Sequence, residues 1–264
     1  MSRSRTVDRR REREREKRRQ QQITLVVVLV AIVVIAALAL ILANQPAEAP
    51  IPEESAARYA GIPQSKTEEG FPRLGNPDAP VKLVDYSSFD CPHCRTFHDE
   101  VQPTILERVR AGEVVFTYIP LYLNIGEGAS RAAICAGEQG KLWEFHDALF
   151  EWQGLYGSQA FANNRLETGI DNLGISRSEW DQCMSSTLPG RIVTASRNAA
   201  NALPGFEGTP TITVNGIIVT PDLTNVVRAI NDELAKSGGA VPVPEATVEA
   251  EATVEATAET TAAP

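Results

Sequence analysis

The chain has 264 residues, a formal net charge of −9 and four cysteines. Positive charge is concentrated at the start: residues 1–22 contain ten Lys or Arg and four Asp or Glu, a net charge of +6, which leaves −15 for the remainder. The net negative charge of the remainder gives no electrostatic reason to expect a nucleic-acid partner. This charge mainly indicates solubility. Once the two ends are set aside, about 170 residues remain, the size of a single globular unit with room for an insertion.

An apolar run over residues 23–43 follows the basic segment, and Thr24 is its one polar residue. As a helix the run is about 31 Å long, enough to cross the hydrocarbon core of a membrane. It is longer than the apolar region of an ordinary signal peptide, and Ala47–Ala49 offers only a weak cleavage site. We therefore favour an uncleaved single-pass anchor in the cell membrane over a long signal peptide. Residues 1–22 would be a basic cytoplasmic tail, and the remainder would be extracytoplasmic.

Two further segments lack the periodicity of helices or strands. Residues 44–70 are rich in Pro, Ala and Glu, and we predict a flexible linker between membrane and domain. Residues 241–264 contain no aromatic residue and repeat Glu-Ala-Thr-Val-Glu-Ala once. Two copies of six residues cannot build a core, so this segment is predicted to be a disordered tail. The folded domain is expected over residues 71–240.

The domain is organised around Cys-Pro-His-Cys at residues 91–94. Residues 81–86 precede it and are rich in β-branched and aromatic types, which predicts a buried strand. The apolar residues that follow recur at four-residue spacing, which predicts a helix. They are Phe97, Val101, Ile105 and Val109. The cysteine pair is thus expected where a strand passes into a helix.

That location has chemical consequences for the first cysteine. If Cys91 is the N-cap, Pro92 occupies the first helical position, and the unpaired N–H groups of the first turn point toward the Cys91 sulfur. The helix dipole and a positive charge on His93 would then favour a thiolate. We expect an acidic, exposed Cys91 nucleophile beside a resolving thiol on Cys94. Asp90 works against this expectation, because a negative charge next to Cys91 should raise the pKa of the Cys91 thiol.

The rest of the domain alternates between helical and extended patterns. Pro103 is predicted to kink or divide the helix, and Gly112 to end it. Residues 114–119 are predicted to form a second strand, parallel to the first. Residues 126–203 show helical spacing that no strand pattern interrupts.

Near the end of the domain the pattern returns to strands. Residues 211–214 and 217–220 are predicted to form a hairpin turned by Asn215 and Gly216, the strongest short hairpin signal. Asp222 is predicted to cap the closing helix.

These features resemble the DsbA-type thiol-disulfide oxidoreductases, thioredoxin-fold proteins with an inserted helical domain. Residues 85–94 resemble the active site of that family, and residues 208–216 resemble its cis-proline loop, strand and turn. The two motifs are far apart and in the right order, which makes the resemblance specific over roughly residues 71–236. It implies an α/β, thioredoxin-like fold with an α-helical insertion at about 126–203, preceded by one transmembrane helix.

The resemblance implies roles for both motifs. Cys91 and Cys94 would be the redox pair; the alternatives are a structural disulfide or half of a zinc site, for which no second ligand pair is visible. Pro210 would follow a cis bond, and Thr209 would contact an extended substrate. Alone, Gly-Thr-Pro is also compatible with an ordinary proline at a strand entry. Asp85 matches an acidic residue that assists proton transfer at the resolving cysteine; the alternative is that it faces solvent.

The other two cysteines and two of the three histidines remain to be assigned. Four cysteines permit three pairings, and a pair at Cys91 and Cys94 leaves Cys135 with Cys183 as a structural disulfide. Closing a loop of about 49 residues would stabilise the fold by roughly 4 kcal/mol. A second redox relay is the alternative. We expect His98 and His146 to be satisfied surface or core histidines, and no metal ligands.

The functional prediction is a membrane-anchored enzyme that introduces disulfides into reduced secreted or surface proteins. It would act as a monomer, with no cofactor other than the Cys91–Cys94 disulfide. The resemblance implies a membrane reoxidant of the DsbB or VKOR type. The alternatives are a reductase or an isomerase of the same fold or, in a different class, a tethered metal-binding or chaperone module.

Overall fold

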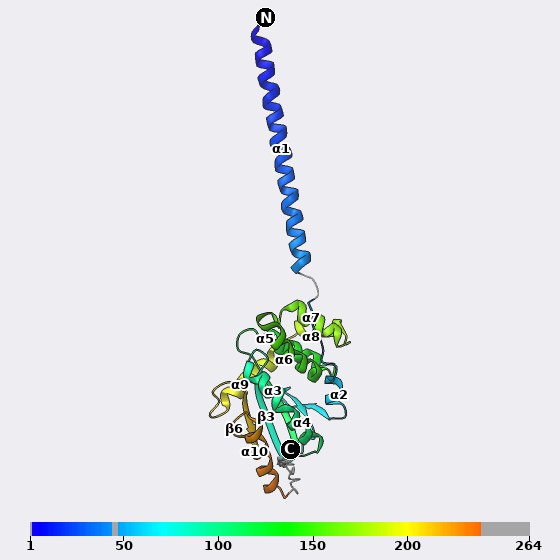
Figure 1. The fold of residues 1–264 in the computed structure, drawn as a ribbon, viewed down its shortest axis with the longest axis vertical. Helices are drawn as coiled ribbons and strands as arrows, with labels where there is room; N and C mark the ends of the chain where they lie inside the picture. The colour runs from blue at the N-terminus through cyan, green and yellow to red at the C-terminus, as the bar shows by residue number, and fades with distance from the viewer. Residues whose placement is uncertain (1, 44–46, 239–264) are drawn as a thin grey trace, which may run out of the picture.

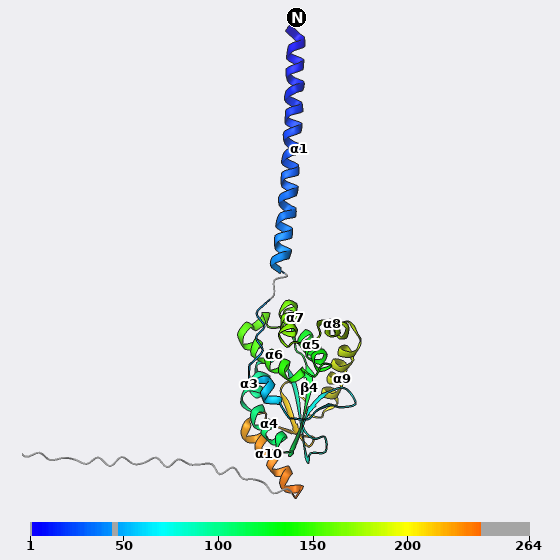
Figure 2. The ribbon, with the colours of Figure 1, turned by 90° about the vertical axis from the view of Figure 1, so that its right-hand side faces the viewer.

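The computed structural model describes residues 2–43 and 47–238. They form a long helix, α1 (Ser2–Ala43), and an α/β domain (Figures 1 and 2). Figure 1 shows α1 as a rod that projects from the domain. Its segment Arg18–Ile41 has a mean hydropathy of 3.4 and buries nothing against the protein, so it is long and apolar enough to cross a membrane. The predicted tail at 241–264 lies outside the described residues.

The domain contains a six-stranded mixed sheet with the order β1-β2-β4-β3-β5-β6. The strands are β1 (Gln64–Lys66), β2 (Pro72–Leu74), β3 (Val81–Ser88), β4 (Val114–Leu121), β5 (Thr211–Val214) and β6 (Ile217–Val219). The central pair β3 and β4 is parallel, as predicted, and the other neighbours are antiparallel. All eight residues of β4 are buried, as expected for a strand covered on both faces.

Helices surround this sheet. They are α2 (Ser55–Tyr59), α3 (Pro92–Glu100), α4 (Gln102–Arg110), α5 (Glu127–Gly137), α6 (Leu142–Tyr156), α7 (Asn163–Asn172), α8 (Arg177–Ser185), α9 (Leu188–Ala202) and α10 (Leu223–Lys236), with a 3₁₀ turn at Gly157–Gln159. In Figure 2, α4 and α10 lie on one side of the sheet and α9 on the other, while α5 to α8 gather at one end. The run from α5 to α9 lies where the sequence predicts a helical insertion, and no strand interrupts it.

Local sequence signals explain several boundaries. The predicted helix after Cys94 is divided into α3 and α4, and Pro103 lies in the first turn of α4, where its missing N–H is harmless. Asn215 and Gly216 both have positive φ, which suits the tight turn of the hairpin between β5 and β6. The Asp222 carboxylate accepts a hydrogen bond from the backbone N–H of Asn225 at 2.9 Å, so the predicted cap of α10 is confirmed.

The prediction of a flexible linker over residues 44–70 is wrong for 47–70. This segment contains α2, β1 and buried side chains, among them Ser55 and Tyr59 at 0% and 3% exposure. Trp152 also donates a hydrogen bond to the Pro50 carbonyl oxygen at 2.7 Å. The Pro, Ala and Glu content is typical of linkers, but the segment is held by polar contacts with α4, α6 and α7 that composition does not reveal.

Candidate active site

The cysteine pair lies where β3 passes into α3. Cys91 is the N-cap of α3 with extended backbone angles, and Pro92 begins the helix, as the sequence predicts. Cys91 is only 4% exposed, so the expectation of an exposed nucleophile is wrong. Cys94 lies deeper, at 1% exposure, and both sulfurs are unlinked in this structure. The His93 side chain is exposed.

The loop before β5 covers Cys91. The Thr209–Pro210 peptide bond is cis, as the resemblance implied, and the Cys91 sulfur lies 3.2 Å from the Thr209 carbonyl oxygen. Antiparallel pairing of β5 with β3 brings this loop to the cysteine pair, although more than a hundred residues of chain separate them. The two motifs identified in the sequence therefore form one site.

The surroundings of Cys91 favour its thiolate. Hydrogen bonding with Cys94 outweighs the effect of burial and, together with contacts from Thr209 and the backbone N–H groups of Cys94 and His93, lowers the pKa of Cys91 to about 5. In the thiol form, Cys91 donates to the Thr209 carbonyl, which cannot help a thiolate. The Thr209 hydroxyl is buried and bonds no other described residue, so it is the group of this loop that is able to donate to the thiolate.

Cys94 has the opposite environment. Burial raises the pKa of Cys94 far above the ordinary thiol value, and the hydrogen bond with Cys91 and the charge of Asp85 add to this effect. The backbone N–H of Ser88 lies 3.4 Å from the Cys94 sulfur. One thiol of the pair is thus acidic, while the other, which lies deeper, stays protonated.

Asp85 is a buried carboxyl group in the central strand β3. Its exposure is 2%, so the alternative that it faces solvent is wrong. The Ser87 hydroxyl donates to it at 2.6 Å. Burial raises the pKa of Asp85 to about 7, a shift that the Ser87 hydrogen bond and the charge of His98 limit. Asp85 is therefore able to accept and release a proton near neutral pH.

The profile of the thioredoxin family matches residues 67–232. The chain belongs to the thioredoxin family. Disulfide bond formation protein D of Bacillus subtilis is 28% identical over 202 residues, which cover 69% of this chain and 84% of that protein. A relative from Rickettsia typhi, provisionally named a protein-disulfide oxidoreductase, is 30% identical over 169 residues. The aligned region spans 61% of the length of the Rickettsia typhi protein. The region aligned with a similarly named protein from Rickettsia bellii spans 66% of that protein's length.

Solved structures of thioredoxin-family members agree with this fold. BdbD from Bacillus subtilis superposes with a TM-score of 0.58 at 22% identity and covers 64% of this chain and 96% of its own. Wolbachia pipientis alpha-DsbA1 superposes with a TM-score of 0.55 at 23% identity, with coverages of 62% and 91%. At such identities the likeness concerns the fold, and it confirms the predicted thioredoxin-like, DsbA-type architecture.

Asp90 does not act in this thioredoxin-family site as its position beside Cys91 suggested. Its carboxylate accepts hydrogen bonds from the Ser88 hydroxyl and from four consecutive backbone N–H groups of residues 123–126, at 2.7–3.0 Å for the backbone donors. These donors outweigh the effect of burial and lower the pKa of Asp90. Asp90 is not among the main groups that shift the pKa of Cys91, so the expected opposition to the thiolate is not seen. Asp90 instead fixes the loop between β4 and α5.

A buried polar cluster that the sequence did not reveal lies behind the cysteine pair. His98 is 7% exposed and has hydrogen-bond partners on both ring nitrogens, as expected for a satisfied histidine. His146 is fully buried among aromatic rings, and its Nδ1 lies 3.6 Å from Asp147 Oδ1, too far for a hydrogen bond. Neither ring nitrogen makes a hydrogen bond among the described residues, so the expectation of a satisfied histidine is wrong for His146. Burial lowers the pKa of His146 to about 4. The third member of the cluster is Asp147. The adjacent His146 and Asp147 in α6 are the sequence signal that could have indicated the cluster.

This cluster is an ion-pair network. One ligand atom from each of His98, His146 and Asp147 lies within 4.8 Å of the other two, a spacing that is also compatible with a bound metal ion. Both Asp147 oxygens, however, already accept hydrogen bonds, one of them from the Arg58 guanidinium. A cation bound there would have to displace these donors, and neither Cys91 nor Cys94 is part of the group.

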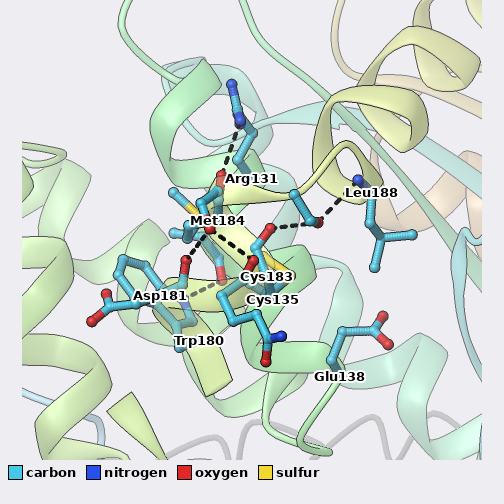
Figure 3. The surroundings of a disulfide bond; sticks show 12 residues. Arg131, Cys135, Glu138, Trp180, Asp181, Cys183, Met184 and Leu188 are labelled. Carbon is cyan, nitrogen blue, oxygen red and sulfur yellow. Dashed lines mark hydrogen bonds between the residues drawn. A yellow bond between two sulfur atoms is a disulfide. The ribbon is translucent and has the colours of Figure 1, made fainter. Parts of the chain in front are cut away.

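The remaining two cysteines, Cys135 of α5 and Cys183 of α8, form a disulfide (Figure 3). Trp180 packs beside the bridge and donates a hydrogen bond to the Ala132 carbonyl oxygen at 3.2 Å. Cys135 is fully buried. The pairing is the one that elimination predicted, and it links two helices of the insertion.

Proposed function

We propose that this protein is a membrane-anchored, extracytoplasmic thiol-disulfide oxidoreductase that introduces disulfides into secreted or surface proteins. The observation that carries the proposal is the asymmetry of the two thiols: Cys91 at the start of α3 is acidic, and Cys94 behind it is not. A stable Cys91 thiolate favours the reduced pair and makes the oxidised pair a strong oxidant. The names of the Bacillus and Rickettsia relatives support the same chemistry.

The reaction is thiol-disulfide exchange in two steps. A substrate thiolate attacks Cys91 of the oxidised pair, the Cys91–Cys94 bond breaks, and the electrons of that bond leave with the Cys94 sulfur. A second substrate thiolate then attacks the substrate sulfur of the mixed disulfide, and Cys91 leaves as a thiolate. Two substrate thiols lose two electrons and two protons and form one disulfide, while the enzyme disulfide becomes a dithiol.

The surrounding residues supply the proton and hold the substrate. Cys94 is buried, so its thiolate needs a nearby acid when the disulfide opens; Asp85, with a pKa of about 7, is suited to this role. The Thr209–Pro210 loop lies against Cys91 and offers backbone groups to an extended substrate. Thr209 also donates to the Cys91 thiolate as it leaves. No cofactor beyond the redox pair enters this scheme.

The topology follows from α1. Its apolar segment is the anchor, and the ten basic residues that precede position 23 hold the N-terminus in the cytoplasm. The domain is then extracytoplasmic, where the bridge between Cys135 and Cys183 is stable. Turnover requires a membrane reoxidant, for which a quinone-linked protein of the DsbB or VKOR type is suited. The enzyme acts as a monomer.

The test is oxidative refolding of reduced, unfolded ribonuclease by the full-length protein in detergent micelles, with glutathione disulfide as the terminal oxidant. We expect refolding that depends on Cys91 and is lost in Cys91→Ser. The reduction potential of the pair should lie near the oxidising end, at about −120 mV. A potential near about −270 mV would favour a reductase. A protein that refolds nothing and retains a stoichiometric metal ion would favour the metal-binding or chaperone module.

A further inference from the structure

Asp147 of α6 is a buried carboxylate held by the segment that precedes the thioredoxin fold. It is 1% exposed, and three donors from α2 reach it: the Ser55 hydroxyl at 2.9 Å, the Arg58 guanidinium at 3.0 Å and the Tyr59 hydroxyl at 2.5 Å. A buried carboxylate without such donors would take up a proton. Hydrogen bonds and nearby positive charge outweigh the effect of burial and lower the pKa of Asp147. Asp147 therefore carries its negative charge inside the domain.

That charge fixes a histidine on the helix of the cysteine pair. His98 lies one turn after Cys94 in α3, and its Nε2 is 2.9 Å from Asp147 Oδ1. Its Nδ1 is 2.8 Å from Asp99 Oδ1. An ionised carboxylate only accepts hydrogen bonds, so an imidazole between two carboxylates donates from both nitrogens and is protonated. Burial alone would lower the pKa of His98, but the hydrogen bonds to Asp147 and Asp99 raise it.

The groups that face His98 come from three other elements. His146 of α6 lies 5.2 Å away between ring centroids and is neutral, and Phe150 stacks on His98 at 4.9 Å. From β3, Asp85 is joined to this group through Tyr118, its neighbour in the parallel ladder, whose ring meets His146 edge-on at 4.9 Å between centroids. The positive charge of His98 lowers the pKa of Asp85 across this distance. From α2, Arg58 pairs with both Asp147 and Glu54. Arg95 of α3 and Glu151 of α6 line the same cavity as His98. Of these charged groups, His98 is the cation that lowers the pKa of Asp85.

Asp85 has a further set of charged or titratable neighbours. Cys91 and Cys94 interact with it from α3, and Tyr118 of β4 is its neighbour in the parallel ladder. A Cys91 thiolate opposes ionisation of Asp85, while the His98 cation supports it. Removing the His98 charge would leave Asp85 with one opposing charge and no cation to balance it.

We propose that Asp147 and His98 are positioning residues for thiol-disulfide exchange: Asp147, held by α2, fixes the His98 imidazole on α3, where its charge governs proton transfer between Asp85 and Cys94. This inference rests on the proposed function, because it assigns a role within that reaction. It also makes α2 part of the active-site support, although α2 lies outside the segment that matches the thioredoxin family.

The experiment is an NMR titration of isotope-labelled aspartate carboxyl carbons in the reduced, full-length protein, with the Asp85 signal assigned by Asp85→Asn. We expect a wild-type midpoint near 7 and a rise of about one pH unit in His98→Gln. Asp147→Asn should also raise the Asp85 midpoint. In the double variant Asp147→Asn, His98→Gln the midpoint should be the same as in His98→Gln alone, because Asp147 acts through His98. The control is Arg108→Met, which breaks a part-buried ion pair between α4 and Glu113 in the loop before β4 and should leave the midpoint unchanged.

A midpoint that is the same in His98→Gln and wild type overturns the proposal. His98→Gln decides this alone if Asp147→Asn fails to fold. The refolding assay is then run between about pH 5 and about pH 9. If the Asp85 midpoint shifts but the pH profile of refolding does not, His98 has no role in the reaction, which also overturns the proposal. If wild type refolds no substrate at any pH, the proposed function fails instead, whatever the titration shows.

Discussion

The bridge between Cys135 and Cys183 allows a prediction with a worked magnitude. The two cysteines are 48 residues apart in the sequence. The loop-entropy relation for a closed loop of about 49 residues gives about 4 kcal/mol of stabilisation at about 25 °C, because the bridge restricts the unfolded chain. We expect its loss to lower the free energy of unfolding of the domain by about that amount.

The cleanest perturbation leaves the bridge residues unchanged. In a Cys91→Ser, Cys94→Ser background, the Cys135–Cys183 bond is the one disulfide that a reductant is able to cleave, since the chain has four cysteines. Urea unfolding of this variant in detergent micelles, with and without reductant, is followed by the fluorescence of its buried tryptophans. Both curves come from one sequence, so neither cavity nor side-chain effects enter the difference. A difference below about 1 kcal/mol would refute the entropic account.

The same bridge separates a structural role from a second redox relay. Cys135→Ala combined with Cys183→Ala, in a chain that keeps Cys91 and Cys94, should refold ribonuclease at the wild-type rate at temperatures where the domain is folded. Loss of refolding activity in a folded double variant would favour the relay. Cys135 is fully buried and lies in α5, and the structure gives it no contact with the cysteine pair.

Three other predictions concern the cysteine pair and its neighbours. Thr209→Val removes a donor to the thiolate, so the pKa of Cys91, followed by the pH dependence of alkylation, should rise by about one unit from about 5; an unchanged pKa would contradict the role of the hydroxyl. The raised pKa of Asp85 means that the folded protein binds more protons than the unfolded chain between about pH 4 and about pH 7, so stability falls as pH rises. Asp85→Asn should therefore be more stable than wild type in urea at about pH 8, a gain that disappears toward about pH 4. Asp90→Ala should speed hydrogen exchange of residues 123–126 and leave the pKa of Cys91 near its wild-type value; slow exchange in the variant would show that other contacts fix the loop.

Local signals in the sequence were sufficient for the parts of the fold that depend on neighbouring residues. The strand before Cys91, the division of the next helix at Pro103, the turn at Asn215 and the cap at Asp222 all follow from backbone preferences that act over a few positions. The cis-proline loop was located by resemblance, since nothing local to Pro210 indicates its contact with a cysteine.

What the sequence did not reveal depends on distant partners. The α2 segment has the composition of a linker, and its anchor at Tyr59 bonds to Asp147, which lies 88 residues further along the chain. The position of Asp90 next to Cys91 predicts an effect on the thiolate. Its actual role depends on its hydrogen bonds with the backbone of residues 123–126, which are distant in the sequence. The burial of Cys91 under Thr209 is also a consequence of strand pairing.

The packing of residues 47–66 on the domain sets a limit on where the enzyme works. Helix α1 ends at Ala43, and Ala49 is already buried, at 3% exposure. Six residues of fully extended chain span at most about 20 Å. If α1 spans the membrane as proposed, the domain would stay next to the bilayer, where Cys91 would be within reach of polypeptides as they emerge from the membrane. Such a position would favour the oxidation of nascent chains before they fold.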